Sequence, residues 1–318
     1  MRDMKKFMLL DIKCDCFDML IASFAAWLKN EYRFLFTECI GFHFNMEGRT
    51  LGDKIMKSKG DIVDIAIRHG IDIKILDINQ LGKERFLAYL KVYNPVILEV
   101  DGYDCYWRDT FQKIHRSHYI LLVKFDIESA SLSCIDTFPT KEGVTIKLDF
   151  AMQRAKRFIY VSADENEIVK LESKNYLVPS TERYMQKDGI GTFFDHMDLF
   201  INSIESQIDL ENEIKGISVS DIIYVPLIWN LKNQSWSYAQ FQYLLEYINA
   251  KELDNMERVI EEIIKSWEIV IGIIAMKIIR KEKIMNAEKM KGYLRKAVND
   301  EKHFADLLSA YVNNGIMQ

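Results

Sequence analysis

Apolar and polar residues alternate in two different ways along the chain, and the change comes near its middle. Up to about residue 165, short apolar runs bounded by turn residues predict β-strands. These runs are "NPVILEVDGY" (94–103), "HYILLVKFD" (118–126), "SLSCIDTF" (131–138), "VTIKLDF" (144–150) and "RFIYVSA" (157–163). Because only "IESA" (127–130) separates the second run from the third, we expect these two strands to form a hairpin.

Helical spacing governs the other segments. The run "MLIASFAAWLK" (19–29) has the length and spacing of a buried helix. After "KDGIG" (187–191), apolar residues recur every three to four positions. They do so in 193–208, 236–253, 255–284 and 302–312. The pattern therefore predicts an α+β domain at residues 1–165, followed by a mainly helical domain at residues 166–318.

Composition and charge narrow the classes of function. Hydrophobic residues make up 49% of the chain and charged residues 28%, as in globular proteins. The net charge of −5 gives no reason to expect a nucleic-acid partner. The apolar run at the N-terminus is too short for a signal peptide, and "IVIGIIAMKII" (269–279) is too short to span a bilayer. We expect a cytoplasmic protein without a membrane partner, in which the five cysteines are reduced thiols.

Two of the cysteines lie one residue apart in "DIKCDCFDML" (11–20). Together with His115 and His118, Cys14 and Cys16 supply enough ligands for zinc, but structural zinc sites favour two to four residues between paired cysteines. A thioredoxin-type redox pair also has two intervening residues. The spacing therefore favours a third interpretation, in which only one of the two thiols is reactive.

Cys16 is the better candidate for a nucleophile. Asp15 is a good N-cap residue, so Cys16 would stand in the first turn of the helix that continues as "FDMLIASFAAWL" (17–28). The helix dipole and the first-turn N–H groups would favour a thiolate there and stabilise an oxyanion. Cys14 would lie outside this helix.

A cysteine nucleophile also needs a base and a group that orients the base. His118 begins a strongly apolar strand, and Asp136 ends the apolar run of the next one. Adjacent strands can bring two such residues together. We expect Cys39, Cys105 and Cys134 to be buried hydrophobic residues. We expect His43, His69, His196 and His303 to lie on the surface or on helix faces.

Four stretches together resemble the papain-like cysteine peptidase superfamily. They are "CDCF" (14–17), "PVILEVDGYDCYW" (95–107), "HRSHYILLVKFD" (115–126) and "CIDTFP" (134–139). The resemblance covers about residues 8–150 and is greatest to the branch that contains the leader-cleaving domains of bacteriocin exporters and the N-terminal domains of the butirosin biosynthesis protein H type. It extends to amide-forming enzymes of the kind found in closthioamide biosynthesis.

The resemblance implies a papain-like domain, in which a central helix packs on an antiparallel sheet, and it implies roles for individual residues. Cys16 would be the nucleophile, His118 the base and Asp136 the orienting acid. Asp101, Tyr103 and Trp107 are candidates for substrate binding, although a turn after a strand or an ordinary core position explains them equally well. One feature departs from the family: residues 8–13, "MLLDIK", lack the glutamine that usually stabilises the oxyanion, and Asp11 would repel one.

Such a site forms an acyl-enzyme and passes the acyl group to a second nucleophile. By resemblance we expect an acyltransferase that forms an amide in natural-product biosynthesis. Its partners would be an acyl or peptidyl carrier protein, whose phosphopantetheine thioester is the donor, and a small amine. No metal or other cofactor is required. The alternatives are a cytoplasmic cysteine peptidase or thioesterase, and a non-enzymatic module that binds a carrier protein.

Overall fold

The chain forms two compact units, each made of two separate segments. In the computed structural model, unit 1 contains residues 1–32 and 62–169, and unit 2 contains residues 33–61 and 170–318. The expected boundary at residues 165–166 lies outside the described residues, whereas residues 33–61 group with the helical part of the chain. The described residues are 7–28, 30–56, 58–137, 140–163, 173–248 and 253–316.

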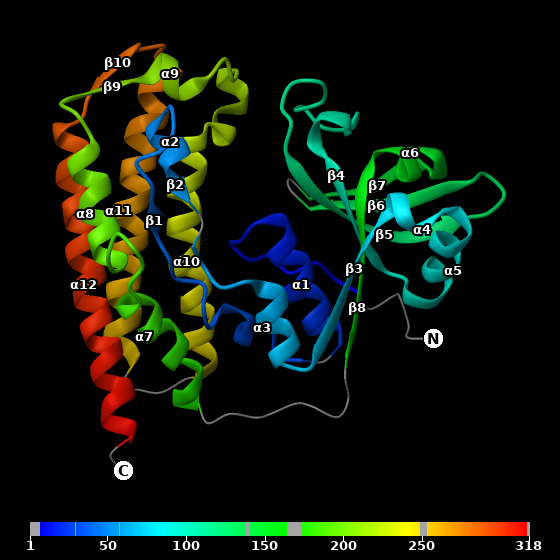
Figure 1. Cartoon of the computed structure of the whole chain (residues 1–318), viewed down its shortest axis with the longest axis horizontal. Coiled ribbons are helices and arrows are strands. Elements are labelled where there is room, and N and C mark those ends of the chain that lie inside the picture. Colours follow the sequence, from blue (N-terminus) through cyan, green and yellow to red (C-terminus); the bar gives the residue numbers. More distant parts are fainter. Residues whose placement is uncertain are drawn as a thin grey trace. The chain divides into compact units, whose positions relative to one another are not determined.

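Unit 1 is built on a six-stranded antiparallel sheet with the strand order β3-β8-β4-β5-β6-β7 (Figure 1). The strands are β3 (Ile71–Asp77), β4 (Val96–Asp101), β5 (Ser117–Asp126), β6 (Ser131–Thr137), β7 (Thr140–Lys147) and β8 (Ala155–Ala163). The predicted α+β class and the β5–β6 hairpin are confirmed. The prediction of a strand through residue 150 was wrong, because the chain turns into a helix after Lys147.

Helices cover both faces of this sheet. The helical elements are α1 (Cys16–Trp27), α3 (Ile62–Arg68), α4 (Ile78–Leu81), α5 (Lys83–Tyr93), η3 (Gly102–Asp104) and α6 (Leu148–Arg154). On one face, Phe86 of α5 and Ala151 of α6 pack with Leu98, Ile120 and Phe158 in a buried core. On the other side α1 contacts β5 and β6 (Figure 1). Since side chains alternate along a strand, β4 and β5 contribute residues to both layers.

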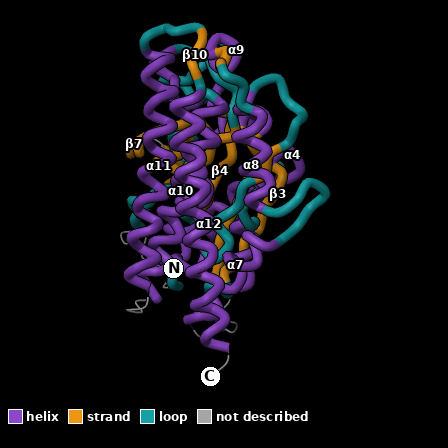
Figure 2. The backbone as a smooth tube through the Cα atoms, turned by 90° about the vertical axis from the view of Figure 1, so that its left-hand side faces the viewer, coloured by secondary structure: helices purple, strands orange, loops and turns teal. Residues whose placement is uncertain are grey.

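Unit 2 is mostly helical, as the spacing of its apolar residues predicts. Its long helices are α10 (Pro226–Ile248), α11 (Asp254–Ile279) and α12 (Glu288–Ile316), and α11 packs against both of the others (Figure 2). The buried side chains of Tyr238, Trp267 and Phe304 fill the space among them. No helix within the described ranges is long and apolar enough to cross a membrane.

Short elements complete unit 2. They are η2 (Tyr32–Phe36), β1 (His43–Phe44), α2 (Leu51–Lys54), β2 (Ile55–Met56), η4 (Ser173–Tyr176), α7 (Val178–Met185), α8 (Phe193–Ser203), β9 (Gln207–Asp209), α9 (Leu210–Ile214), η5 (Val219–Tyr224) and β10 (Ile284–Asn286). The helix expected over 193–208 therefore ends at Ser203, since the residues after it form β9, which pairs with β10.

Candidate active site

Cys16 is the first residue of α1. Asp15 caps this helix, and its carboxylate accepts the backbone N–H of Asp18 at 2.9 Å. Cys14 lies outside the helix and is buried, with only 1% of its surface exposed. The helix start expected from the sequence is confirmed, so Cys16 is the thiol at the positive end of the helix.

The Cys16 thiol is nevertheless protonated at neutral pH. Burial, together with the charge of Asp15, raises the pKa of Cys16 to about 11. A backbone hydrogen bond from Tyr119 and the positive charges of Arg116 and Arg108 oppose this rise without cancelling it. Burial therefore outweighs the effect of the helix N-terminus that the sequence suggested, and the thiol needs a base to become a nucleophile.

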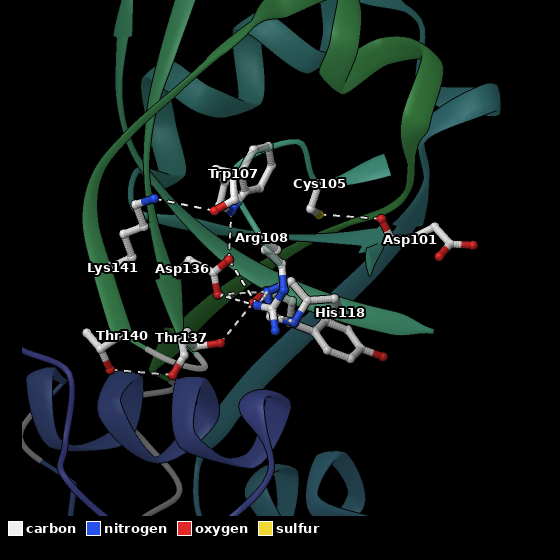
Figure 3. A network of polar contacts seen from close by, with 10 residues as sticks. Asp101, Cys105, Trp107, Arg108, His118, Asp136, Thr137, Thr140 and Lys141 are labelled. Carbon is white, nitrogen blue, oxygen red and sulfur yellow. Dashed lines mark hydrogen bonds and ion pairs between the residues drawn. The ribbon is translucent and has the colours of Figure 1, made fainter. Parts of the chain in front are cut away.

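The structure brings His118 and Asp136 together. His118 lies opposite Val100 on β4, and Asp136 of β6 lies opposite Ile120 on β5, so both side chains emerge on one face of the sheet. The His118 Nε2 atom is 2.8 Å from Asp136 Oδ1 (Figure 3). His118 is 5% exposed and Asp136 is 1% exposed, so this contact is shielded from water.

Two residues of the loop after β4 complete the polar cluster. The Trp107 indole donates to Asp136 Oδ2 at 2.7 Å. The Arg108 guanidinium donates to Asp136 Oδ1 at 2.8 Å, and its Nη1 lies 2.7 Å from His118 Nε2 (Figure 3). Trp107, a candidate for substrate binding, thus also contacts the acid. Arg108 was not anticipated from the sequence, although it directly follows Trp107.

These contacts set the charge of the pair. Burial lowers the pKa of His118, and the charge of Arg108 lowers it further, against the opposing effect of Asp136. Burial works to raise the pKa of Asp136, but the hydrogen bond with His118 and the charge of Arg108 outweigh it and lower that pKa. At neutral pH the cluster therefore holds a carboxylate, a guanidinium and a neutral imidazole. A neutral imidazole can accept a proton.

The thiol is hydrogen-bonded to the backbone of Tyr119, the residue after His118, but it is not joined to the pair. Phe17, the residue after Cys16, packs its ring on Tyr119 with centroids 4.7 Å apart. Alternation along β5 puts the Tyr119 and His118 side chains on opposite faces of the sheet. Within the described part of the chain, no hydrogen bond links the Cys16 thiol to the His118 ring. The free chain thus presents an oriented His–Asp pair and a thiol that does not contact it.

Asp101 and Tyr103 form a separate cluster at the end of β4. Asp101 accepts the backbone N–H groups of Tyr103 and Arg116, each at 3.0 Å, and lies 3.1 Å from His115 Nδ1. The Tyr103 ring stacks on His115 at 4.0 Å. Figure 3 shows the Asp101 carboxylate directed away from the His118–Asp136 pair. These contacts give Asp101 a role in shaping the loop.

The structure also tests the predictions for the remaining cysteines, for a zinc site at Cys14 and Cys16, and for His196. Cys39, Cys105 and Cys134 are buried, as expected. Among the described residues, the groups that could hold a metal do not include Cys14, Cys16, His115 and His118, so the zinc interpretation gains no support. His196, expected on the surface or on a helix face, lies on α8 and is buried, with 3% of its surface exposed.

Comparison with known proteins assigns the chain to no group. No protein-family model matches it, and no curated protein matches its sequence at a significant level.

Proposed function

We propose that the chain is a cysteine-dependent acyltransferase. It transfers an acyl group from a carrier-protein thioester to an amine through an acyl-Cys16 intermediate, in a papain-like domain. The observation that carries the proposal is the buried His118–Asp136 pair. A carboxylate 2.8 Å from Nε2 orients the imidazole, as a general base requires. The family resemblance of the sequence points to the same two residues.

The first step acylates the enzyme. His118 accepts the thiol proton of Cys16, and the sulfur attacks the thioester carbonyl. A new C–S bond forms at Cys16 while the C–S bond to phosphopantetheine breaks, and the departing thiolate takes the proton from His118. The raised pKa of Cys16 means that proton transfer accompanies attack rather than preceding it.

The second step forms the amide. The amine nitrogen attacks the acyl-Cys16 carbonyl and gives a proton to His118. The C–S bond to Cys16 then breaks, and the Cys16 thiolate recovers that proton. The outcome depends on excluding water, because water in place of the amine gives a free acid.

Positive charge supports the oxyanion in place of the glutamine that the sequence lacks. Arg108 and Arg116 both favour negative charge at Cys16, as does the N-terminal end of α1. A thioester donor is already activated and needs less of this stabilisation than a peptide bond does. This difference favours transfer from a thioester over proteolysis.

The mechanism requires the Cys16 thiol and the His118 ring to meet when the donor binds. Catalytic hydrogen bonds are often long in free enzymes and tighten only with substrate. The thiol already contacts the backbone of Tyr119, the next residue along β5.

One observation favours a second candidate function. The open Cys–His contact and the raised thiol pKa are what a non-catalytic relative would show, one that binds a carrier protein without forming an acyl-enzyme. Such a module would bind the carrier equally well with or without Cys16.

The test incubates the chain with acyl-pantetheine thioesters and a panel of small amines, with amide and free acid quantified by mass spectrometry. We expect amide from the wild type and from Cys14→Ala, and none above background from Cys16→Ala. Free acid alone would identify a hydrolase. If the wild type and Cys16→Ala give the same products at the same rate, the proposal fails.

A further inference from the structure

We propose that unit 2 contains a zinc-binding site formed by His43, Asp188 and His196. The ligand atoms of these three side chains lie within 4.8 Å of one another. All three residues belong to unit 2, so the site is independent of the acyltransferase proposal. Two imidazoles and one carboxylate are a ligand set that zinc uses when it keeps one coordination position open.

The three ligands converge on one point. His43 Nδ1 is 3.1 Å from Asp188 Oδ2, and His196 Nε2 is 2.9 Å from the same oxygen. With zinc–ligand bonds of about 2.0–2.2 Å, neighbouring ligand atoms in a tetrahedral site lie about 3.3 Å apart. In these two pairs the ligand atoms therefore need to separate by only a few tenths of an ångström to accept the ion.

The surroundings hold His196 and Asp188 as the outer shell of a metal site does. The other nitrogen of His196, Nδ1, is 3.2 Å from both the N–H and the carbonyl oxygen of Phe44. When Nδ1 donates to the carbonyl, as a metal-bound histidine does to its outer-shell partner, the Nε2 lone pair faces Asp188 Oδ2 at 2.9 Å and is available to a metal ion.

Asp188 is oriented by its own turn. Its Oδ1 atom accepts the backbone N–H groups of Ile190 at 2.8 Å and Gly191 at 3.1 Å, which leaves Oδ2 for the histidines. The turn leads into α8 through Gly191, which has a φ of +154°. A Cβ atom at Gly191 would lie 2.5 Å from the Asp195 side chain, so a larger residue is excluded there. The start of α8 thus fixes Asp188 and His196 relative to each other.

A cavity of about 200 Å³ borders the cluster and gives access to a fourth coordination position. The three side chains differ in exposure: that of His196 is 3% exposed, that of His43 is 29% and that of Asp188 is 43%. Arg183 also lines the cavity, but it is paired with Glu38 at 2.9 Å, so its charge is offset. The single negative charge of Asp188 then suits a divalent cation.

The test is calorimetric titration of the metal-free full chain with zinc chloride. We expect one saturable site per chain. His43→Ala and Asp188→Asn each remove a ligand at a partly exposed position, and each should weaken zinc binding by more than about 100-fold, because loss of an outer-shell partner alone costs 10–100-fold.

Two control variants keep the result specific. His303→Ala removes an exposed histidine of α12, and Cys16→Ala removes the thiol of the candidate active site; both should bind zinc as the wild type does. Absence of saturable binding, or unchanged affinity in His43→Ala and Asp188→Asn, would overturn the site and identify the cluster as hydrogen-bonded histidines only. Loss of binding in Cys16→Ala alone would place the zinc on the cysteines and overturn it too.

Discussion

The ion pair between Arg108 and Asp136 gives the most quantitative prediction. The Arg108 side chain is 7% exposed and that of Asp136 is 2% exposed, with 2.8 Å between Nη1 and Oδ1. Replacing one member leaves the other charge buried without its counterion. Breaking a buried pair in this way costs about 3–5 kcal/mol, whereas an exposed pair contributes about 1 kcal/mol or less.

The structure ranks the two single variants. Arg108→Met leaves Asp136 with hydrogen bonds from Trp107 and His118, so we expect a loss of stability at the lower end of this range, about 3 kcal/mol. Asp136→Asn leaves a buried guanidinium against a neutral amide, so the upper end, about 5 kcal/mol, is expected. The double variant has no unpaired charge, so it should lose less than Arg108→Met alone, below about 3 kcal/mol, rather than the additive value of about 8.

Urea denaturation followed by tryptophan fluorescence and far-UV circular dichroism measures these free energies of unfolding. Lys74→Met is a matched control, because Lys74 pairs with Asp72 at 2.8 Å on the surface, and it should cost less than about 1 kcal/mol. If the two losses add to within about 0.5 kcal/mol, or if each is as small as that of the control, the reasoning about a buried charge pair is refuted.

Two further predictions concern pH. Burial raises the pKa of Glu301 to about 8, so the folded chain keeps a proton that the unfolded chain loses above about pH 4.3, and stability falls as pH rises from there to about 8. Glu301→Gln removes this slope, so its free energy of unfolding should rise by a few kcal/mol relative to that of the wild type between these two pH values. Urea denaturation at several pH values measures both proteins, and parallel pH curves would contradict the prediction. Because the pKa of Cys16 is raised to about 11, the rate of iodoacetamide labelling of Cys16 in the free chain should still increase above pH 9. Peptide mapping follows this rate, and a plateau below about pH 8 would show that the thiol is not held protonated.

Local signals explain what the sequence allowed us to predict. The N-cap Asp15 and the apolar run behind it define the start of α1, and "IESA" between two apolar runs defines the β5–β6 hairpin. With the hairpin in place, the register of two adjacent strands brings His118 to Asp136. The edge strand β3 was overlooked, although Ile71, Ile73 and Ile75 alternate with polar residues in it.

What was missed depends on contacts between distant residues. Arg108 sits in a loop where a charged residue is normally solvated, and it is buried only because Asp136, 28 residues later, neutralises it. His196 lies on an amphipathic helix, and its contact with the backbone of Phe44 joins residues 152 positions apart. The rise in the pKa of Cys16 has the same origin, since β5 covers a helix start that would be exposed in isolation.

Covalent capture of the acyl group tests the central claim most directly. The wild type is mixed with an acyl-pantetheine thioester in the absence of amine. Mass spectrometry of the intact chain then counts the acyl groups, and peptide mapping locates them. The proposed mechanism predicts one acyl group per chain, on the peptide that contains Cys16, retained in Cys14→Ala and lost in Cys16→Ala. An unmodified wild-type chain under conditions where it consumes the thioester, or an acyl group on Cys14 instead, would contradict the assignment of Cys16 as the nucleophile.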